Sequence, residues 1–258
     1  MTLQPAPKTL SRPNGGAIAY HAHPGDTPGV MFCGGFMSEM TGDKALAFEE
    51  FCTARGQAFV RFDYSGHGAS AGELTDGTIG SWADDAIAIL DDVATGPQIL
   101  VGSSMGGWLM LLAALARPGR MAGLIGISSA PDFTENLIWR HLDGDERVTL
   151  ARDGVIYQAN EYGDEPYAIT MGLIEDGRKH LLLASPISIT CPVRLFHGMA
   201  DRDVPWRVSA KLARRLETDD VAVTLVKDAN HRFSRRQDIA RICQAIDELS
   251  QPRPAAGD

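Results

Sequence analysis

The sequence predicts an α/β fold in which a mostly parallel sheet is covered by helices on both faces. Short apolar runs alternate with helical segments along most of the chain, a pattern typical of parallel strands joined by crossover helices. At 258 residues the chain is long enough to bury about three quarters of its unfolded surface. With 44% hydrophobic and 22% charged residues, it has the composition of an ordinary globular protein. We therefore expect a single domain over residues 1–258.

The expected elements follow in order along the chain. The apolar runs predicted to form strands lie near residues 30–33, 58–63, 98–103, 123–129, 191–197 and 221–227. The expected helices lie near residues 43–55, 80–93, 105–117, 205–217 and 236–249. Residues 10–22 are expected to add an antiparallel edge hairpin, with Asn14, Gly15 and Gly16 as its turn.

Residues 132–185 interrupt the alternation and are expected to form a small helical cap, because they begin where a strand reaches the carboxyl edge of the sheet. Eleven acidic and five basic residues between positions 132 and 184 give a net charge of −6, which we interpret as a solvated surface that disfavours polyanionic substrates. Residues 251–258 are expected to form a frayed tail. Apolar residues expected to pack the cap, some of them lining an acyl pocket, are Leu137, Ile138, Trp139, Tyr157, Tyr162, Tyr167, Met171 and Leu173.

A serine stands at the junction of a predicted strand and a predicted helix. Ser104 follows the apolar run 99–101, with Gly102 two positions before it and Gly106 two positions after it. The residue at the apex of such a sharp turn has a positive φ, so only very small residues fit at these flanking positions. Ser103 is the neighbouring alternative, but valine and methionine occupy its own flanking positions. The pattern predicts a nucleophile at Ser104, although taken alone it also fits a tight structural turn.

A serine hydroxyl becomes a good nucleophile when an imidazole takes its proton and a carboxylate orients that imidazole. Of the seven histidines, His231 follows the last predicted strand, in a polar loop before the closing helix. His197 ends a strand, which favours a hydrogen-bonded structural role, and His67 lies in a glycine-rich loop that folds back on itself. We therefore predict His231 as the general base.

The acid is expected in the loop between the strand that ends at Gly198 and the helix that begins near Pro205. Asp201 is preferred, because the turn that precedes it is long enough to bring its carboxylate back over the sheet edge. Asp203 is close enough to the helix to serve as its N-cap. Asp132, after the preceding strand, is a third candidate.

The resulting chain order of serine, aspartate and histidine is the order found in α/β-hydrolases. In that fold the oxyanion hole takes one amide from the residue after the nucleophile, here Met105, and one from the loop after the first buried strand. That loop begins with two glycines, and we assign its donor to the amide of Phe36. The sequence thus predicts an α/β-hydrolase fold and a serine hydrolase that forms an acyl-enzyme intermediate on Ser104.

Blocks of sequence at 44–47, 49–52, 61–66, 96–104, 106–111, 116–118, 197–199 and 204–206 also carry a family likeness. In these blocks the chain resembles the abhydrolase domain-containing protein 10 family of α/β-hydrolases. The resemblance implies hydrolysis of S-acyl thioesters on proteins and of acyl glucuronides, and it places the family's nucleophile, acid and base on Ser104, Asp201 and His231. The chain departs from the family in residues 132–185, which match poorly, and in lacking a transit segment.

The composition and motifs of the chain limit the kinds of partner and cofactor that we expect it to bind. A net charge of −9 argues against nucleic acid, which needs a basic face. The chain has no dinucleotide-binding or phosphate-binding loop and no metal motif, so no cofactor or metal is expected. It also has no run of 18 apolar residues, so no membrane span is expected. Residues 1–10 lack an apolar or Arg-rich segment and the four cysteines have no paired spacing, from which we predict a cytoplasmic location.

The expected substrate is a small-molecule or protein-linked acyl ester or thioester. Both kinds of bond are cleaved through the same tetrahedral chemistry, so the sequence leaves open the choice between them, the acyl chain length and the oligomeric state. The alternative from another functional class is a non-catalytic protein that keeps the fold to bind a ligand or partner. A fluorophosphonate probe distinguishes the two, since it labels an activated serine.

Overall fold

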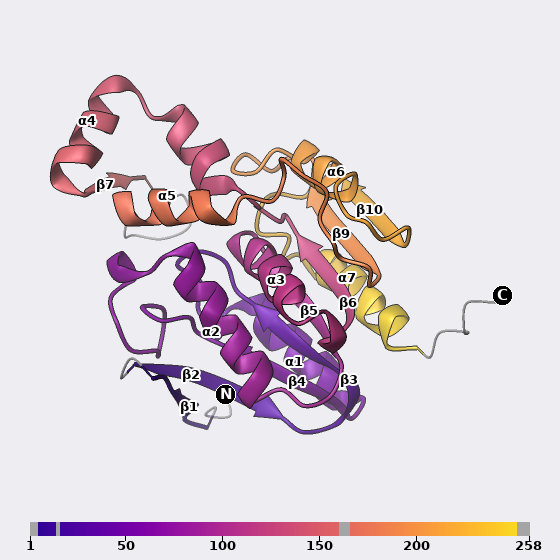
Figure 1. Ribbon diagram of the computed structural model, residues 1–258. Helices are drawn as coiled ribbons and strands as arrows, with labels where there is room; N and C mark the ends of the chain where they lie inside the picture. Colours follow the sequence, from indigo (N-terminus) through magenta and orange to yellow (C-terminus); the bar gives the residue numbers. More distant parts are fainter. Residues whose placement is uncertain (1–4, 14–15, 160–165, 252–258) are drawn as a thin grey trace.

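A computed structural model describes residues 5–13, 16–159 and 166–251 (Figure 1). Within these ranges an eight-stranded sheet has the strand order β1-β2-β4-β3-β5-β6-β9-β10. The β1–β2 and β2–β4 pairs are antiparallel and all other neighbours are parallel, which confirms the mostly parallel sheet. The strands are β1 (Lys8–Ser11), β2 (Ala17–His23), β3 (Asp26–Cys33), β4 (Gln57–Phe62), β5 (Gln98–Ser103), β6 (Met121–Ile127), β9 (Val193–Gly198) and β10 (Val221–Val226).

Helices cover both faces of this sheet, as the sequence predicts. The pair α1 and α7 packs on one face, and α2, α3 and α6 pack on the other (Figure 1). None of the described helices is both long and apolar enough to cross a membrane. The helices are α1 (Asp43–Ala54), α2 (Ile79–Asp92), α3 (Met105–Ala116), α4 (Gly144–Asp153), α5 (Met171–Gly177), α6 (Arg207–Ala213) and α7 (Arg236–Ser250). Short helical turns are η1 (Leu74–Asp76), η2 (Pro118–Arg120), η3 (Thr134–Ile138), η4 (Trp139–His141) and η5 (Arg178–His180).

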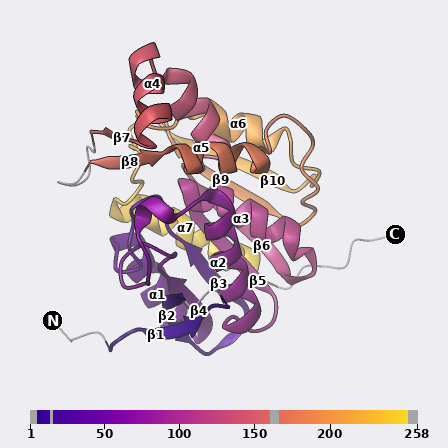
Figure 2. The same ribbon diagram turned by 60° about the vertical axis from the view of Figure 1, so that its left-hand side comes forward.

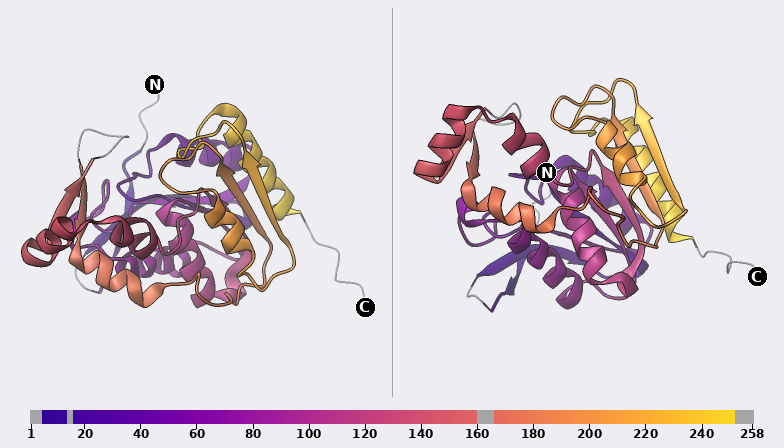
Figure 3. Two further views of the ribbon diagram at one scale, coloured as in Figure 1. Left: turned by 90° about the horizontal axis from the view of Figure 1, so that it is seen from above. Right: turned by 45° about the horizontal axis from the view of Figure 1, so that its top comes forward.

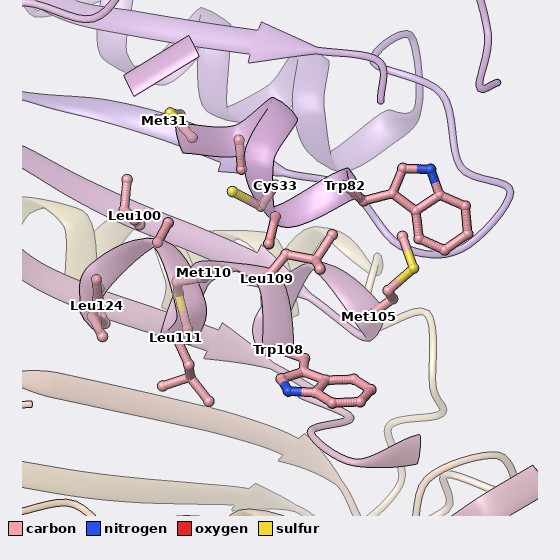
Figure 4. Close-up of a cluster of buried hydrophobic side chains, with 14 of the residues drawn as sticks. Met31, Cys33, Trp82, Leu100, Met105, Trp108, Leu109, Met110, Leu111 and Leu124 are labelled. Atoms are coloured by element: carbon pink, nitrogen blue, oxygen red, sulfur yellow. The ribbon is translucent and has the colours of Figure 1, made fainter. Parts of the chain in front are cut away.

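The central strands read as unbroken apolar runs because both of their faces are buried. Successive side chains of a strand point to opposite faces, so Val30 and Phe32 of β3 pack against α1 and α7. Met31 and Cys33 of the same strand join the core beneath α2 and α3, to which the fully buried Trp82 also belongs (Figure 4). Burial of each large apolar side chain contributes roughly 1.5–3 kcal/mol to stability. The sheet is therefore a rigid platform for the loops at its carboxyl edge.

Most expected elements are present, with ends shifted by a few residues. The expected edge hairpin is formed by β1 and β2, while its predicted turn at Asn14 and Gly15 lies outside the described residues. Nearly all of the expected tail, residues 252–258, also lies outside them. The helix expected over 205–217 is wrong in length, because the chain turns after α6 so that Leu216 forms a parallel bridge with Ile187.

Residues 132–185 leave the sheet between β6 and β9 and contain α4, α5 and two strands that the sequence did not predict, β7 (Val155–Gln158) and β8 (Tyr167–Thr170). The strand period of two turns Ile156 inward and leaves Tyr157 65% exposed, so the packing role predicted for Tyr157 is wrong. Tyr162 lies outside the described residues. A small core of its own holds the segment together: Leu142, Leu150, Ile156, Ile169 and Ile174.

This insertion lies to one side of the layers of sheet and helices. Figures 1 and 2 show α4, β7 and α5 grouped beyond one end of α2 and α3, and Figure 3 shows the group projecting outward in two further views. Asp132 fixes its return to the sheet, since its carboxylate accepts hydrogen bonds from the amides of Leu182 (2.7 Å) and Leu183 (2.9 Å). The third candidate for the catalytic acid therefore has a structural task.

Candidate active site

Ser104 lies at the apex of the turn from β5 to α3, with φ 54° and ψ −120°. A non-glycine residue rarely adopts such backbone angles, and they persist where the surroundings impose them. Here the surroundings are β6 and its following turn. The Ser104 amide donates to the carbonyl of Ile127 (2.9 Å), and the Ser104 carbonyl accepts from the amide of Ala130 (3.0 Å). The sharp turn predicted from the glycine pattern is thus held between neighbouring segments.

The glycine two positions after Ser104 permits close contact with the end of β3. A Cβ placed on Gly106 would lie 2.1 Å from the carbonyl oxygen of Cys33 and 2.3 Å from that of Gly34. These are backbone atoms of the segment that leads to Phe36. The small residue therefore lets the nucleophile turn and the predicted oxyanion loop lie against each other.

Replacement of Gly106 by alanine is accordingly expected to lower the free energy of unfolding by about 3 kcal/mol, a typical cost of overpacking where only the backbone can yield. Gly119→Ala is the matched control, because a Cβ on Gly119 meets nothing within 4 Å. Urea denaturation of the two variants measures the difference. Equal stabilities would contradict the close approach described here.

His231 lies between the serine and a buried carboxylate. Its Nε2 is 3.0 Å from Ser104 Oγ, and its Nδ1 is 2.8 Å from Asp201 Oδ2. Ser104 follows β5, Asp201 follows β9 and His231 follows β10, so the carboxyl ends of three parallel strands bring the groups together. The structure thus places all three predicted residues in one hydrogen-bonded chain.

Asp201 rather than Asp203 makes the short contact with His231. The Asp201 side chain has no exposed surface, and its Oδ1 accepts from the amides of Asp203 and Val204, each at 2.9 Å. The nearest carboxylate oxygen of Asp203 is 4.0 Å from His231 Nδ1. The N-cap role proposed for Asp203 is not what the structure has, because Trp206 is the N-cap of α6 and makes no side-chain capping bond.

Burial alone would raise the pKa of Asp201, but hydrogen bonds from His197 and His231 outweigh it and hold the pKa well below the usual range. His197 is fully buried, and its Nε2 lies 3.1 Å from Asp201 Oδ2 and 2.9 Å from the carbonyl of Val204. The hydrogen-bonded role predicted for His197 is present, and it reaches the acid itself. Asp201, Asp203 and His231 also form a cluster of possible metal ligands. Both oxygens of Asp201 already accept hydrogen bonds, however: Oδ1 from two backbone amides and Oδ2 from His197 and His231.

The two predicted oxyanion donors border the same cavity as Ser104. Met105 opens α3, where first-turn amides have no acceptor within the helix. Phe36 follows Gly35, at which an added Cβ would lie only 3.5 Å from the Cβ of Ser104. Both residues therefore lie beside Ser104 at the edge of the same cavity.

This cavity has a volume of about 850 Å³, within the usual range for small-molecule sites. One wall is apolar and comes largely from residues 132–185; it comprises Phe133, Leu137, Ile138, Tyr167 and Ile169. Other lining residues are polar and come from the loop between β3 and α1, the start of α1 and the loop after β10: Ser38, Thr41, Asp43, Lys44, Arg232 and Ser234. The cavity thus presents both apolar and polar surface to whatever bond lies at Ser104.

Lys44 lines the cavity, and the sequence analysis assigned it no chemical role. Its ammonium group donates to the carbonyl of Arg232, which is adjacent to His231, and so links α1 to the histidine loop. Burial lowers the pKa of Lys44 to about 8. No local pattern indicates this contact, because 188 positions separate the two residues.

The fold defines an α/β-hydrolase, and comparisons with known proteins agree. The family model described as serine aminopeptidase S33 matches residues 28–143. The solved structure of alpha/beta hydrolase domain-containing protein 10 from mouse is similar with a TM-score of 0.88 and 44% identity, over 95% of this chain and 98% of that one. A hydrolase from Agrobacterium vitis S4 gives a TM-score of 0.91 and 40% identity, over 96% of this chain and 100% of that one.

Curated relatives identify the family of α/β-hydrolases to which the chain belongs. Human palmitoyl-protein thioesterase ABHD10 is 44% identical over 93% of this chain and 78% of its own length. The mouse protein of the same name is 46% identical over 90% of this chain and 78% of its own length. The chain belongs to the ABHD10 family, and it is a hydrolase of ester or thioester bonds.

The relatives also correct the predicted location. They are named as mitochondrial proteins, which contradicts the cytoplasmic location inferred from the sequence. The inference rested in part on cysteines without paired spacing, and the structure has four free cysteines. Free thiols argue against an oxidising compartment, but they do not distinguish one reducing compartment from another.

Proposed function

We propose that this chain is an acyl thioesterase that releases long fatty acyl groups from thiols, including cysteine thiols of proteins, through Ser104, His231 and Asp201. The observation that carries the proposal is the 3.0 Å contact between Ser104 Oγ and His231 Nε2, two residues that line a cavity with one apolar wall. The names of the relatives, palmitoyl-protein thioesterases, support the choice of substrate class. The apolar wall would take the acyl chain and the polar lining residues the thiol carrier.

In the proposed mechanism Ser104 Oγ attacks the acyl carbonyl while His231 Nε2 takes the hydroxyl proton. Asp201 accepts a hydrogen bond from Nδ1–H of His231, which keeps the proton on Nδ1 and leaves the Nε2 lone pair facing the serine. The amides of Phe36 and Met105 stabilise the oxyanion of the tetrahedral intermediate, each contributing about 10²- to 10³-fold in rate. The intermediate collapses, the C–S bond breaks, and His231 returns the proton to the thiolate. Water then attacks the acyl-enzyme carbonyl while His231 Nε2 takes its proton, the ester bond to Ser104 Oγ breaks, and His231 returns the proton to Oγ as the fatty acid leaves.

A chain-length series tests the substrate class. With S-acyl N-acetylcysteamines from C2 to C16, kcat/KM is expected to rise by up to about fourfold for each methylene that becomes buried, since each contributes about 0.8 kcal/mol. The rise should stop when the chain fills the apolar wall. A maximum at C2 to C4 would contradict the long-chain assignment and leave a short-chain esterase.

A matched pair of variants locates the acyl wall. Leu137→Trp is expected to move the optimum to shorter chains, because Leu137 lines the cavity and a larger side chain would fill it. Val148→Trp is the control, since Val148 is 63% exposed on α4. An unchanged profile in the Leu137 variant would place the acyl chain elsewhere.

A further inference from the structure

The loop that carries Phe36 contains a residue in an unusual backbone conformation. Met37 has φ 55°, in the left-handed region that side-chain-bearing residues seldom occupy. Its amide belongs to the peptide that directly follows Phe36, so a contact that fixes this peptide also restrains, through the Cα of Phe36, the adjacent peptide that bears the Phe36 amide. Conformations of this kind persist when neighbouring groups enforce them, and they gather at active sites. The neighbour that contacts the Met37 amide is a histidine.

His67 accepts a hydrogen bond at Nε2 from the amide of Met37, at 3.2 Å. Its Nδ1 lies 3.3 Å from the carbonyl of Ser65, which can only accept, so the proton belongs on Nδ1. Burial lowers the pKa of His67 and outweighs the opposing effect of the Ser65 bond. The ring is therefore neutral at neutral pH, and its Nε2 lone pair is available to Met37.

The imidazole is itself held in place by aromatic neighbours. His67 is 3% exposed and meets Trp82 edge to face, with ring centroids 5.2 Å apart and an interplanar angle of 83°. Tyr64 lies on another side, with its centroid 5.6 Å away. The indole of Trp82 donates to the carbonyl of Ser65 (3.0 Å), and the same carbonyl accepts the hydrogen bond from His67 Nδ1. A ring fixed on several sides can hold the amide of Met37 in one direction.

The far end of the loop has separate anchors. Asp63 Oδ1 accepts from the amide of Met40 at 2.6 Å, and Arg61 donates to the carbonyl of Met40 at 3.1 Å. Both come from the end of β4, which lies next to β3 in the sheet. These contacts fix where the loop returns to the sheet, while His67 acts three residues earlier, beside Phe36. Loss of His67 should therefore displace the Phe36 peptide without unfolding the loop.

We propose that His67 is a positioning residue of the oxyanion hole: through the Met37 amide it aims the Phe36 amide at the substrate oxygen. This inference rests on the proposed roles of Ser104, Phe36 and Met105. It requires that loss of the His67 acceptor weaken binding of the tetrahedral state and leave binding of the ground state nearly unchanged, because the oxyanion exists only in the former.

Two variants separate the acceptor from the ring. His67→Phe keeps an aromatic ring among Tyr64 and Trp82 but has no acceptor for Met37. His67→Gln has an acceptor at about the position of Nε2 and no ring. Ile242→Val, in the core beneath α7, serves as a control for a small loss of stability away from the site. Melting temperature, kcat and KM for a preferred acyl thioester, and the inhibition constant of an alkyl boronic acid that mimics the tetrahedral state, are measured for each.

For His67→Phe, kcat is expected to fall about 10- to 100-fold with KM within about threefold of wild type, the size of effect seen when an oxyanion donor is misplaced. The boronic acid inhibition constant should rise by a similar factor, and His67→Gln should recover most of kcat. Wild-type kcat in His67→Phe, or a fall in kcat with unchanged boronic acid affinity, would overturn the assignment. Failure of the proposed function would instead appear in the wild type, as absence of thioester hydrolysis or of fluorophosphonate labelling.

Discussion

Replacement of Ser104 by alanine is expected to lower kcat for an acyl thioester by about 10⁴- to 10⁶-fold, the range for loss of a triad nucleophile. In the proposed mechanism the hydroxyl oxygen of Ser104 forms the acyl-enzyme, and alanine has no atom that can replace it. His231 and the two oxyanion amides would remain, so a small residual rate above the uncatalysed reaction is expected from binding and electrostatics alone. The backbone angles of Ser104 are also available to alanine at no greater cost, so the variant should fold.

The measurement pairs hydrolysis with covalent labelling. A fluorophosphonate should label the wild type and fail to label Ser104→Ala, with the melting temperature showing that both are folded. Ser103→Ala is the matched control, because this neighbouring serine also borders the cavity but ends β5 and has ordinary strand geometry. It should keep kcat within about tenfold of wild type, because it changes only the shape of the cavity wall beside the site. Activity that survives in Ser104→Ala and disappears in Ser103→Ala would reverse the assignment.

The features that can be predicted from the sequence are those that depend on residues close together in the chain. The glycines flanking Ser104 are close to it in the chain, and the crowding at Gly106 explains why a larger residue cannot stand there. The carboxylate and the imidazole were found from their position after a predicted strand, because parallel strands deliver their carboxyl ends to one edge. Fold class, strand identities and the neighbourhood of the site all follow from such short patterns.

Contacts between segments that are distant in the chain leave no such local pattern. The bond from Met37 to His67 joins a loop after β3 to a loop after β4, and a glycine-rich stretch around a histidine shows no sign of it. The same holds for Lys44, whose partner lies at the other end of the chain. In the insertion, four-residue strands are too short for a periodic signal, so Tyr157 was predicted inward although its neighbour Ile156 takes that place. Tertiary packing determines these contacts and orientations, and it cannot be inferred from local patterns in a single sequence.

Asp201→Asn is expected to lower kcat by about 10⁴-fold, with little change in the overall structure. The carboxylate accepts a hydrogen bond from Nδ1–H of His231, which keeps Nε2 free to take the proton of Ser104. An asparagine amide can donate to Nδ1 instead, and the imidazole would then carry its proton on Nε2, where it cannot act as a base. Asp203→Asn is the control, because that carboxylate lies 4.0 Å from Nδ1 and should alter kcat by no more than about threefold. Equal losses in the two variants would contradict the assignment of Asp201 as the acid.

The same substitution should reveal itself in stability as a function of pH. The folded-state pKa of Asp201 lies below its unfolded value of about 3.9, so the ionised carboxylate stabilises the fold above that pH and the contribution is lost as pH falls through the folded pKa. Asp201→Asn removes the ionisable group, and its melting temperature should therefore lie furthest below that of the wild type near neutrality. The gap should narrow as the pH is lowered past about 4. A gap independent of pH would show that the hydrogen-bond geometry, and not the charge of Asp201, accounts for its effect on the fold, while the loss of kcat would still report on the tautomer of His231.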